Sequence, residues 1–280
     1  MQQQTKKILV IQTAFIGDVI LATGMLEKLH HSFPYAEIDL LVRKGNESLF
    51  NGHPYLHKVL VWNKKEKKYK GLWNLLKQIR KEKYHWVINA QRFANSGFLT
   101  AFSGALLKTG FVKNPFSFLF DEKIAHEVNN GLHEVQRNHM LIEKYTDQYF
   151  LKPKLYPTAS DFEKVANFKS KPFICLAPAS VWFTKQFPQE QWVSFLEKVE
   201  FSGRIYLIGA PSDHDLCQDI ISKSRRADVE NLCGQLNLLQ SAALMKDATM
   251  NYVNDSAPMH LASAVNAKTC AIFCSTIPDF

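Results

Sequence analysis

The fold is decided by residues 7–42, which read KILVIQTAFIGDVILATGMLEKLHHSFPYAEIDLLV. An apolar, β-branched run from Lys7 to Gln12 predicts a buried strand, and the amphipathic stretch from Asp18 to Phe33 predicts a helix. A second apolar run, from Glu37 to Val42, predicts the next strand. Two strands joined by a helical crossover form a parallel βαβ unit, so the chain begins as an α/β fold.

This alternation runs through the chain in two series, separated by the stretch 151–157, which contains two prolines and no periodicity. We therefore predict two Rossmann-like domains, residues 1–155 and 156–280, with mostly parallel sheets and helices on both faces. In the first we expect further strands at 58–62 and 86–89 and helices at 72–83 and near 132–149. In the second we expect strands at 173–177, 204–208, 249–253 and 269–273 and helices at 189–198, 213–224, 238–246 and 259–265.

The composition, 46% hydrophobic and 21% charged over 280 residues, is that of an ordinary folded protein. The amino terminus lacks a signal-peptide core, and no apolar stretch approaches the roughly 18 to 20 residues of a spanning helix. We expect a cytoplasmic protein whose membrane contacts are peripheral. The five cysteines fall at irregular spacing in apolar surroundings, so we expect reduced, buried thiols, including Cys270 and Cys274, and no zinc.

The net charge of +8 favours anionic partners. It concentrates between Lys64 and Lys83, where nine lysines and arginines face two glutamates. This basic segment is either a docking site for anionic groups or a solvated helix face. We expect no nucleic-acid partner, because no recognised binding motif accompanies the charge.

The junction between the first strand and helix, residues 12–18, has a single glycine and no GxGxxG motif, which disfavours a dinucleotide-dependent dehydrogenase. Asp18 stands where the helix begins. It either caps free backbone N–H groups or serves as a general base that takes a proton from a sugar hydroxyl.

The junction at residues 252–260 ends a strand, turns through small polar residues and starts a helix near Pro258. Backbone N–H groups around Ser256 and Ala257, with the helix dipole behind them, are suited to hold a diphosphate without a metal ion. A plain helix cap is the alternative.

The segments Phe15–Thr23 (FIGDVILAT) and Asn254–His260 (NDSAPMH) resemble the lipopolysaccharide heptosyltransferases of glycosyltransferase family 9. The resemblance implies a GT-B fold, in which two Rossmann-like domains face a central cleft. It also implies an enzyme that moves heptose from ADP-heptose to the inner core of lipopolysaccharide, with inversion and with neither metal nor cofactor. The partners would be the nucleotide sugar, bound by the second domain, and an anionic acceptor, bound by the first at the cytosolic face of the inner membrane.

The resemblance also assigns roles to single residues. Asp18 becomes the base, and Lys185, before an aromatic-proline pair, would bind the diphosphate as it leaves, so these two are the expected catalytic residues. The remaining expected donor-binding residues are Ser180, Asp213, Asp255, Ser256, Ala257 and His260, and the expected acceptor-binding residues are Gly17 and Arg137. A helix cap explains Asp213 equally well, and a solvated helix face explains Arg137.

Two departures from the family pattern bear on activity. Ala257 stands where many heptosyltransferases have glycine, and the chain ends at Phe280 where family members continue through a further strand and helix. We therefore expect a second domain that is short at its carboxyl end. The alternatives are a transferase that uses another nucleotide sugar, or a catalytically impaired paralogue that binds one.

Overall fold

A computed structural model describes residues 6–64, 68–127 and 131–276. The chain divides into two compact units, with the boundary between Lys154 and Leu155. Each unit is built on its own sheet, and every strand pairing in the described ranges is parallel.

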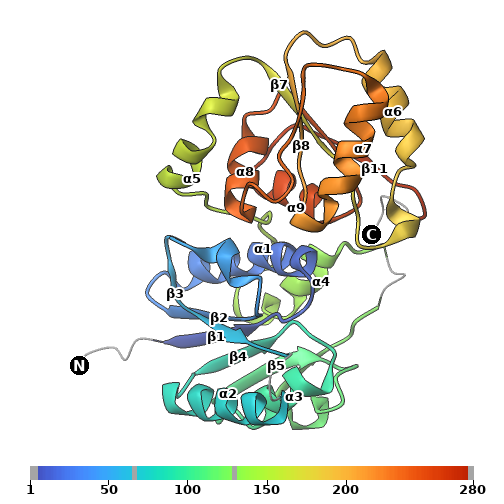
Figure 1. Ribbon diagram of the computed structural model, residues 1–280. Helices are drawn as coiled ribbons and strands as arrows, with labels where there is room; N and C mark the ends of the chain where they lie inside the picture. Colours follow the sequence, from blue (N-terminus) through green and yellow to red (C-terminus); the bar gives the residue numbers. More distant parts are fainter. Residues whose placement is uncertain (1–5, 65–67, 128–130, 277–280) are drawn as a thin grey trace. The chain divides into compact units, whose positions relative to one another are not determined.

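The first unit is a six-stranded sheet in the order β3-β2-β1-β4-β5-β6. Its strands are β1 (Lys7–Ile11), β2 (Glu37–Arg43), β3 (Leu56–Trp62), β4 (Trp86–Asn89), β5 (Leu107–Phe111) and β6 (Glu122–Ile124). Helices α1 (Ile16–Ser32) and α4 (Glu134–Met140) cover one face, and α2 (Lys68–Glu82) and α3 (Ala94–Ala101) cover the other (Figure 1). Apolar side chains of β1, β4, α2 and α3 form one buried core, because each helix turns an apolar stripe to the sheet.

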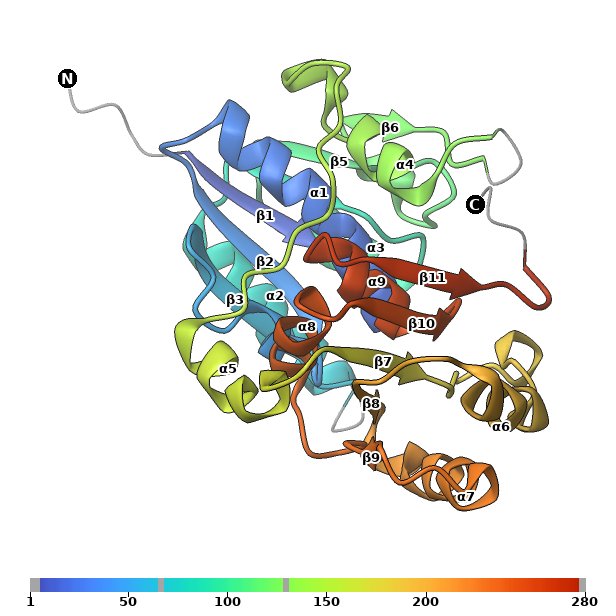
Figure 2. The same ribbon diagram turned by 90° about the horizontal axis from the view of Figure 1, so that it is seen from above.

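The second unit repeats this plan with five strands in the order β11-β10-β7-β8-β9, which Figure 2 shows side by side. The strands are β7 (Phe173–Ala177), β8 (Arg204–Leu207), β9 (Val229–Asn231), β10 (Met250–Asn254) and β11 (Thr269–Ile272). The helices are α5 (Ala159–Lys164), α6 (Gln189–Lys198), α7 (His214–Ser224), α8 (Leu238–Lys246) and α9 (Ala257–Ala264). Counted from its own first strand, its order matches that of the first unit, so both are doubly wound Rossmann-like sheets.

The stretch that was expected to be a linker packs on α1 up to the unit boundary. Lys154 N donates to Thr23 Oγ1 at 2.9 Å. A Cβ at Gly24 would lie 2.5 Å from the Leu151 carbonyl oxygen, so glycine is what lets the chain approach the helix this closely.

Two structural expectations were wrong. The helix expected near 132–149 ends at Met140, because the chain folds back until His139 Nε2 lies 2.7 Å from the Asp147 carbonyl oxygen. In a continuous helix those residues would stand about 12 Å apart along the axis. Cys270, on the edge strand β11, and Cys274, in the segment after that strand, are exposed rather than buried. Cys175, Cys217 and Cys233 are buried as expected.

Candidate functional site

The donor-side candidates gather where the second sheet changes its direction of winding. β7 and β10 are hydrogen-bonded neighbours, with Ala177 opposite Val253, and their crossovers run to opposite sides of the sheet. Ligands of open α/β sheets bind beyond the carboxyl ends of the strands at such a point. The loop after β7 carries Ser180 and Lys185, and the loop after β10 leads through Asp255 into α9.

Lys185 and Asp255 form an ion pair that joins these two loops, with 2.6 Å between Nζ and Oδ2. Thr276 Oγ1 donates to the same carboxylate oxygen at 2.8 Å. Burial works to raise the pKa of Asp255, but the hydrogen bonds from Lys185 and Thr276, with the charges of Lys185 and His260, outweigh it and hold that pKa below its usual value. Asp255 is therefore ionised at neutral pH and holds the Lys185 ammonium beside the start of α9.

Asn254 fixes the two loops to each other, a role that sequence reasoning missed. This residue is fully buried at the end of β10, where its Nδ2 donates to the Pro178 carbonyl oxygen at 2.7 Å. Its Oδ1 accepts from Phe187 N at 3.2 Å. A polar residue that ends an apolar strand was the available signal.

The hydroxyl groups of Ser180 and Ser256 lie in the same loops. Ser180 Oγ accepts from Trp182 N at 3.3 Å. Ser256 precedes the first residue of α9 but makes no capping bond to the helix; its Oγ lies 3.5 Å from the Ala179 carbonyl oxygen. The structure therefore does not show the plain helix cap that was the alternative for this turn. Ala257 is the first residue of α9, so its backbone N–H has no partner within the helix.

Asp213 lies in a neighbouring loop and is used within it. Its Oδ2 accepts from Ala210 N at 2.8 Å, and its Oδ1 accepts from Ser212 Oγ at 3.2 Å. The carboxylate thus stabilises the turn after β8 but makes no capping bond to α7, which begins at the next residue.

In the first unit, Asp18 lies beyond the carboxyl end of β1, which is the first strand of its sheet as β7 is of the second sheet. It is the third residue of α1 and directly follows Gly17. Burial, followed by the charge of Glu134, raises the pKa of Asp18, although backbone hydrogen bonds at Asp18 and Phe15 and the charge of Arg92 act to lower it. Capping and base chemistry coexist here, because a partly buried carboxylate with a raised pKa accepts a proton more readily.

Arg137, an expected acceptor-binding residue, does not lie on a solvated helix face, the alternative given for it, because only 5% of it is exposed. Its Nε donates to Glu134 Oε2 at 2.8 Å, and its Nη1 donates to the Leu132 carbonyl oxygen. The same Glu134 oxygen lies 3.7 Å from His126 Nε2. Arg137 therefore fixes Glu134, whose charge acts on Asp18.

Three side chains hold the loop that leads to Asp18. Lys64 Nζ donates to the Thr13 carbonyl oxygen at 2.7 Å, and Asn46 Nδ2 donates to the Ala14 carbonyl oxygen at 3.1 Å. The Arg43 guanidinium lies 4.5 Å from the centre of the Phe15 ring. Burial, together with the charge of Arg43, lowers the pKa of Lys64. From the sequence, Lys64 was only one cation of a basic segment.

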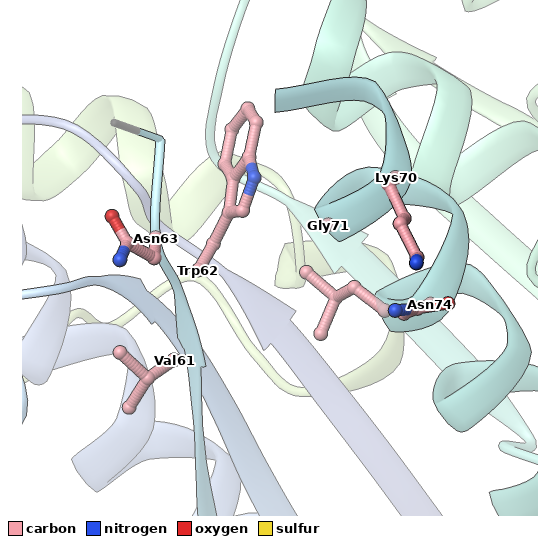
Figure 3. Close-up of a pocket in the computed structure, with 7 residues that line it drawn as sticks. Val61, Trp62, Asn63, Lys70, Gly71 and Asn74 are labelled. Carbon is pink, nitrogen blue, oxygen red and sulfur yellow. The ribbon is translucent and has the colours of Figure 1, made fainter. Parts of the chain in front are cut away.

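A cavity of about 320 Å³ opens at the carboxyl end of β3, beside the start of α2 (Figure 3). Its lining residues are Val61, Trp62, Asn63, Lys70, Gly71, Asn74 and Leu75. Trp62 is 3% exposed, and its indole N–H has no hydrogen-bond partner among the described residues. The lining offers N–H donors and a cation but no carboxylate, which suits an anionic or hydroxylated ligand.

Within residues 6–64, 68–127 and 131–276, no three His, Cys, Asp or Glu side chains gather as metal ligands do. No helix in the same ranges combines the length and apolar character needed to cross a bilayer.

Comparison with known proteins shows which family this chain belongs to. The sequence model of glycosyltransferase family 9 (heptosyltransferase) matches residues 72–280. Lipooligosaccharide heptosyltransferase 2 of Haemophilus influenzae is 24% identical, over 98% of this chain and 84% of that protein. Lipopolysaccharide heptosyltransferase 2 of Escherichia coli is 21% identical, again over 98% and 84%.

Solved structures agree in fold. The Escherichia coli ADP-heptose lps heptosyltransferase II superposes with a TM-score of 0.83 at 21% identity, covering 98% of this chain and 86% of that one. A family 9 glycosyl transferase from Veillonella parvula gives 0.89 at 20% identity, covering 100% and 84%. Escherichia coli heptosyltransferase WaaC with ADP-2-deoxy-2-fluoro heptose gives 0.80 at 20% identity, covering 97% and 90%. The two Rossmann-like units are thus those of the GT-B fold.

Proposed function

Because the chain belongs to glycosyltransferase family 9 (heptosyltransferase) and is a glycosyltransferase, we propose that it moves heptose from ADP-heptose to the inner core of lipopolysaccharide. Relatives that carry this activity in their names match nearly the whole chain. A solved relative of the same fold binds an ADP-heptose analogue, which supports ADP-heptose as the donor. This transfer of heptose would take place in the cytoplasm, at the cytosolic face of the inner membrane.

The observation that carries the proposal is the Lys185–Asp255 pair beside the amino terminus of α9. Departure of ADP leaves negative charge on the diphosphate, and a lysine with free helix N–H groups stabilises such charge. Asp255 would position Lys185, while Ser180, Ser256 and the Ala257 backbone would donate to phosphate oxygens and His260 would line the site. No metal is needed in this scheme, since these groups supply the positive charge.

Asp18 would act as the base of an inverting displacement. The acceptor hydroxyl oxygen would attack the anomeric carbon on the face opposite ADP, forming one C–O bond while the bond to the diphosphate breaks. The hydroxyl proton would pass to Asp18, whose raised pKa suits it to receive that proton. Gly17 would let the acceptor approach the backbone closely.

The acceptor would bind through the first unit. The cavity beside Trp62 and Lys70 offers donors to a phosphate, a carboxylate or sugar hydroxyls. Arg137 would act through Glu134 rather than by touching the acceptor, since both of its bonds stay within its own segment. Asp213 would reach donor ribose hydroxyls only by giving up bonds in its own turn.

The test is ADP release by the full chain with ADP-heptose and an inner-core acceptor. Replacing Asp18 with asparagine should lower kcat by about 10²- to 10⁴-fold, the usual contribution of a general base. Asp215→Asn is the matched control, because its side chain is fully exposed. Equal rates for wild type and Asp18→Asn would refute the base, and loss of activity with EDTA would refute metal independence.

Another donor or an impaired paralogue is the alternative, supported by Ala257 in place of glycine. Thermal shifts with ADP, UDP and GDP would separate the donors. Tight ADP binding without turnover on any acceptor would favour the paralogue.

A further inference from the structure

Helix α2 exposes a stripe that is not needed for the core. Trp73, Lys77, Arg80 and Lys81 lie at helical spacing on its outer side, and all four are exposed. Trp73 keeps 53% of its surface exposed. An indole ring has an apolar body and a polar N–H, and such rings are enriched at protein interfaces and at membrane interfaces.

Aromatic rings continue this stripe onto α3 and the loop after β5. Trp73 and Phe98 have ring centres 6.4 Å apart, and Phe98 lies 5.1 Å from Phe102 and 6.2 Å from Phe116. Arg80 Nη1 donates to the Phe102 carbonyl oxygen at 3.3 Å, which joins the basic stripe to the aromatic one. In Figure 1, α2 and α3 lie side by side on the face of the sheet that α1 and α4 leave open.

We propose that this α2–α3 face, made of Trp73, Lys77, Arg80, Lys81, Phe102 and Phe116, docks on an anionic lipid surface. The charge of this face favours an anionic lipid surface over a protein as the partner. Between Lys68 and Phe120 the sole acidic residue in the sequence is Glu82, and its carboxylate is held by Lys7 and Lys58. Lysine is depleted at protein–protein interfaces, whereas aromatic rings beside lysine and arginine suit a headgroup layer.

The docking face rests on the proposed function, because it gives the transferase a lipid-borne acceptor as its substrate. Lys70, on the same helix, lines the cavity beside Trp62. A bilayer against α2 would therefore bring the headgroup sugars of an anchored acceptor near that cavity, while the lipid tails stay away from the sheet.

The test is cosedimentation of the full chain with vesicles of phosphatidylethanolamine and phosphatidylglycerol, against vesicles of phosphatidylcholine alone, at about 0.1 M salt. Wild type should bind only the anionic vesicles. Lys77→Glu with Lys81→Glu should weaken binding about thirtyfold or more, and Trp73→Ala should weaken it severalfold. The matched controls are Lys164→Glu with Lys198→Glu, and Trp182→Ala, whose indole is 61% exposed in the second unit.

Lys77→Glu with Lys81→Glu, and likewise Trp73→Ala, should transfer heptose to a water-soluble acceptor at the wild-type rate and to a vesicle-borne acceptor more slowly. Equal vesicle binding by wild type and the α2 variants would overturn the docking face. The docking face would also be overturned if sedimentation showed that the wild type is a dimer that does not bind vesicles and that dissociates when Trp73 is replaced by alanine. Vesicle binding without turnover on any acceptor would instead refute the proposed function and leave the docking face standing.

Discussion

Asp18 lies where burial and a neighbouring negative charge disfavour the ionised form of its carboxyl group. Its carboxyl group is partly buried at the first turn of α1, and the negative charge of Glu134 acts on it, so its pKa rises despite Arg92 and the backbone hydrogen bonds. A residue chosen only to cap the helix would gain from the lowest pKa available. The raised pKa therefore fits a proton acceptor better than a structural cap.

Asp18→Asn should make the protein more stable at neutral pH. With a pKa above the unfolded value, the folded state binds the proton more tightly, so the contribution of Asp18 to stability is greatest at low pH and is lost as pH rises through the folded pKa. The free energy of unfolding of the variant, measured with urea, should exceed that of wild type at pH 7. The difference should vanish at acid pH; a variant that is less stable than wild type at pH 7 would show that capping dominates.

Asp255 affects the pH dependence of stability with the opposite sign. The pKa of Asp255 is lowered in the fold, so its stabilisation is present above the unfolded pKa and is lost as pH falls through the folded one. Lys185→Met should cost about 1–2 kcal/mol at pH 7, because it leaves a mostly buried carboxylate with one hydrogen bond fewer. A double-mutant cycle with Asp255→Asn measures the coupling, and a coupling unchanged at pH 2 would contradict the assignment.

Helix α3 is held by a close approach at Gly97. A Cβ there would overlap Asn114 Oδ1 and lie 2.8 Å from Asn114 Cγ. Asn114 is buried and donates to the carbonyl oxygens of Gln91 and Phe93, both at 3.1 Å. The loop after β4 and the start of α3 therefore depend on this amide.

Gly97→Ala should lower the free energy of unfolding by about 1–3 kcal/mol, the usual cost of overpacking. A glycine inside an unconstrained helix would behave in the opposite way, since alanine there stabilises by about 0.5–1 kcal/mol. The sign of the change in thermal midpoint thus decides between a close contact and an ordinary helical site.

Elements with strong local patterns could be predicted, and those that depend on distant contacts could not. The bounds of β4, β7, α6 and α8 agree with the sequence prediction, because each combines apolar periodicity with a clear start or stop. Strand β5 (LKTGF) was missed because lysine and glycine interrupt its apolar run, and α3 (ANSGFLTA) because it contains asparagine, serine and glycine. Both are fixed by tertiary packing instead.

The candidate site divides in the same way. The resemblance named Lys185 and Asp255 as candidates, but their ion pair spans seventy positions of sequence and no local pattern encodes it. The bond from Lys64 to the Thr13 carbonyl oxygen and the role of Asn254 between two loops are equally non-local. Residue types could be predicted as candidates, whereas partners required the fold.

The two units share one strand order, yet their sites differ in chemistry. The second presents an ion pair and a helix amino terminus, which suit a diphosphate, while the first presents a carboxylate of raised pKa and a cavity lined by donors. This division predicts that each substrate slows amide hydrogen exchange in the unit that binds it. It can be tested on the intact chain by hydrogen exchange.

Saturating ADP should slow amide exchange in residues 178–187 and 254–260, the loops that carry Lys185 and Asp255, because bound phosphate would occupy their N–H groups. Exchange in residues 12–18 should stay unchanged with ADP and slow with a soluble inner-core acceptor. Lys185→Ala should remove the ADP effect and leave the acceptor effect intact, whereas Trp62→Phe should weaken the acceptor effect alone. Protection by ADP confined to the first unit would reverse the assignment of donor and acceptor, and with it the role proposed for Asp18.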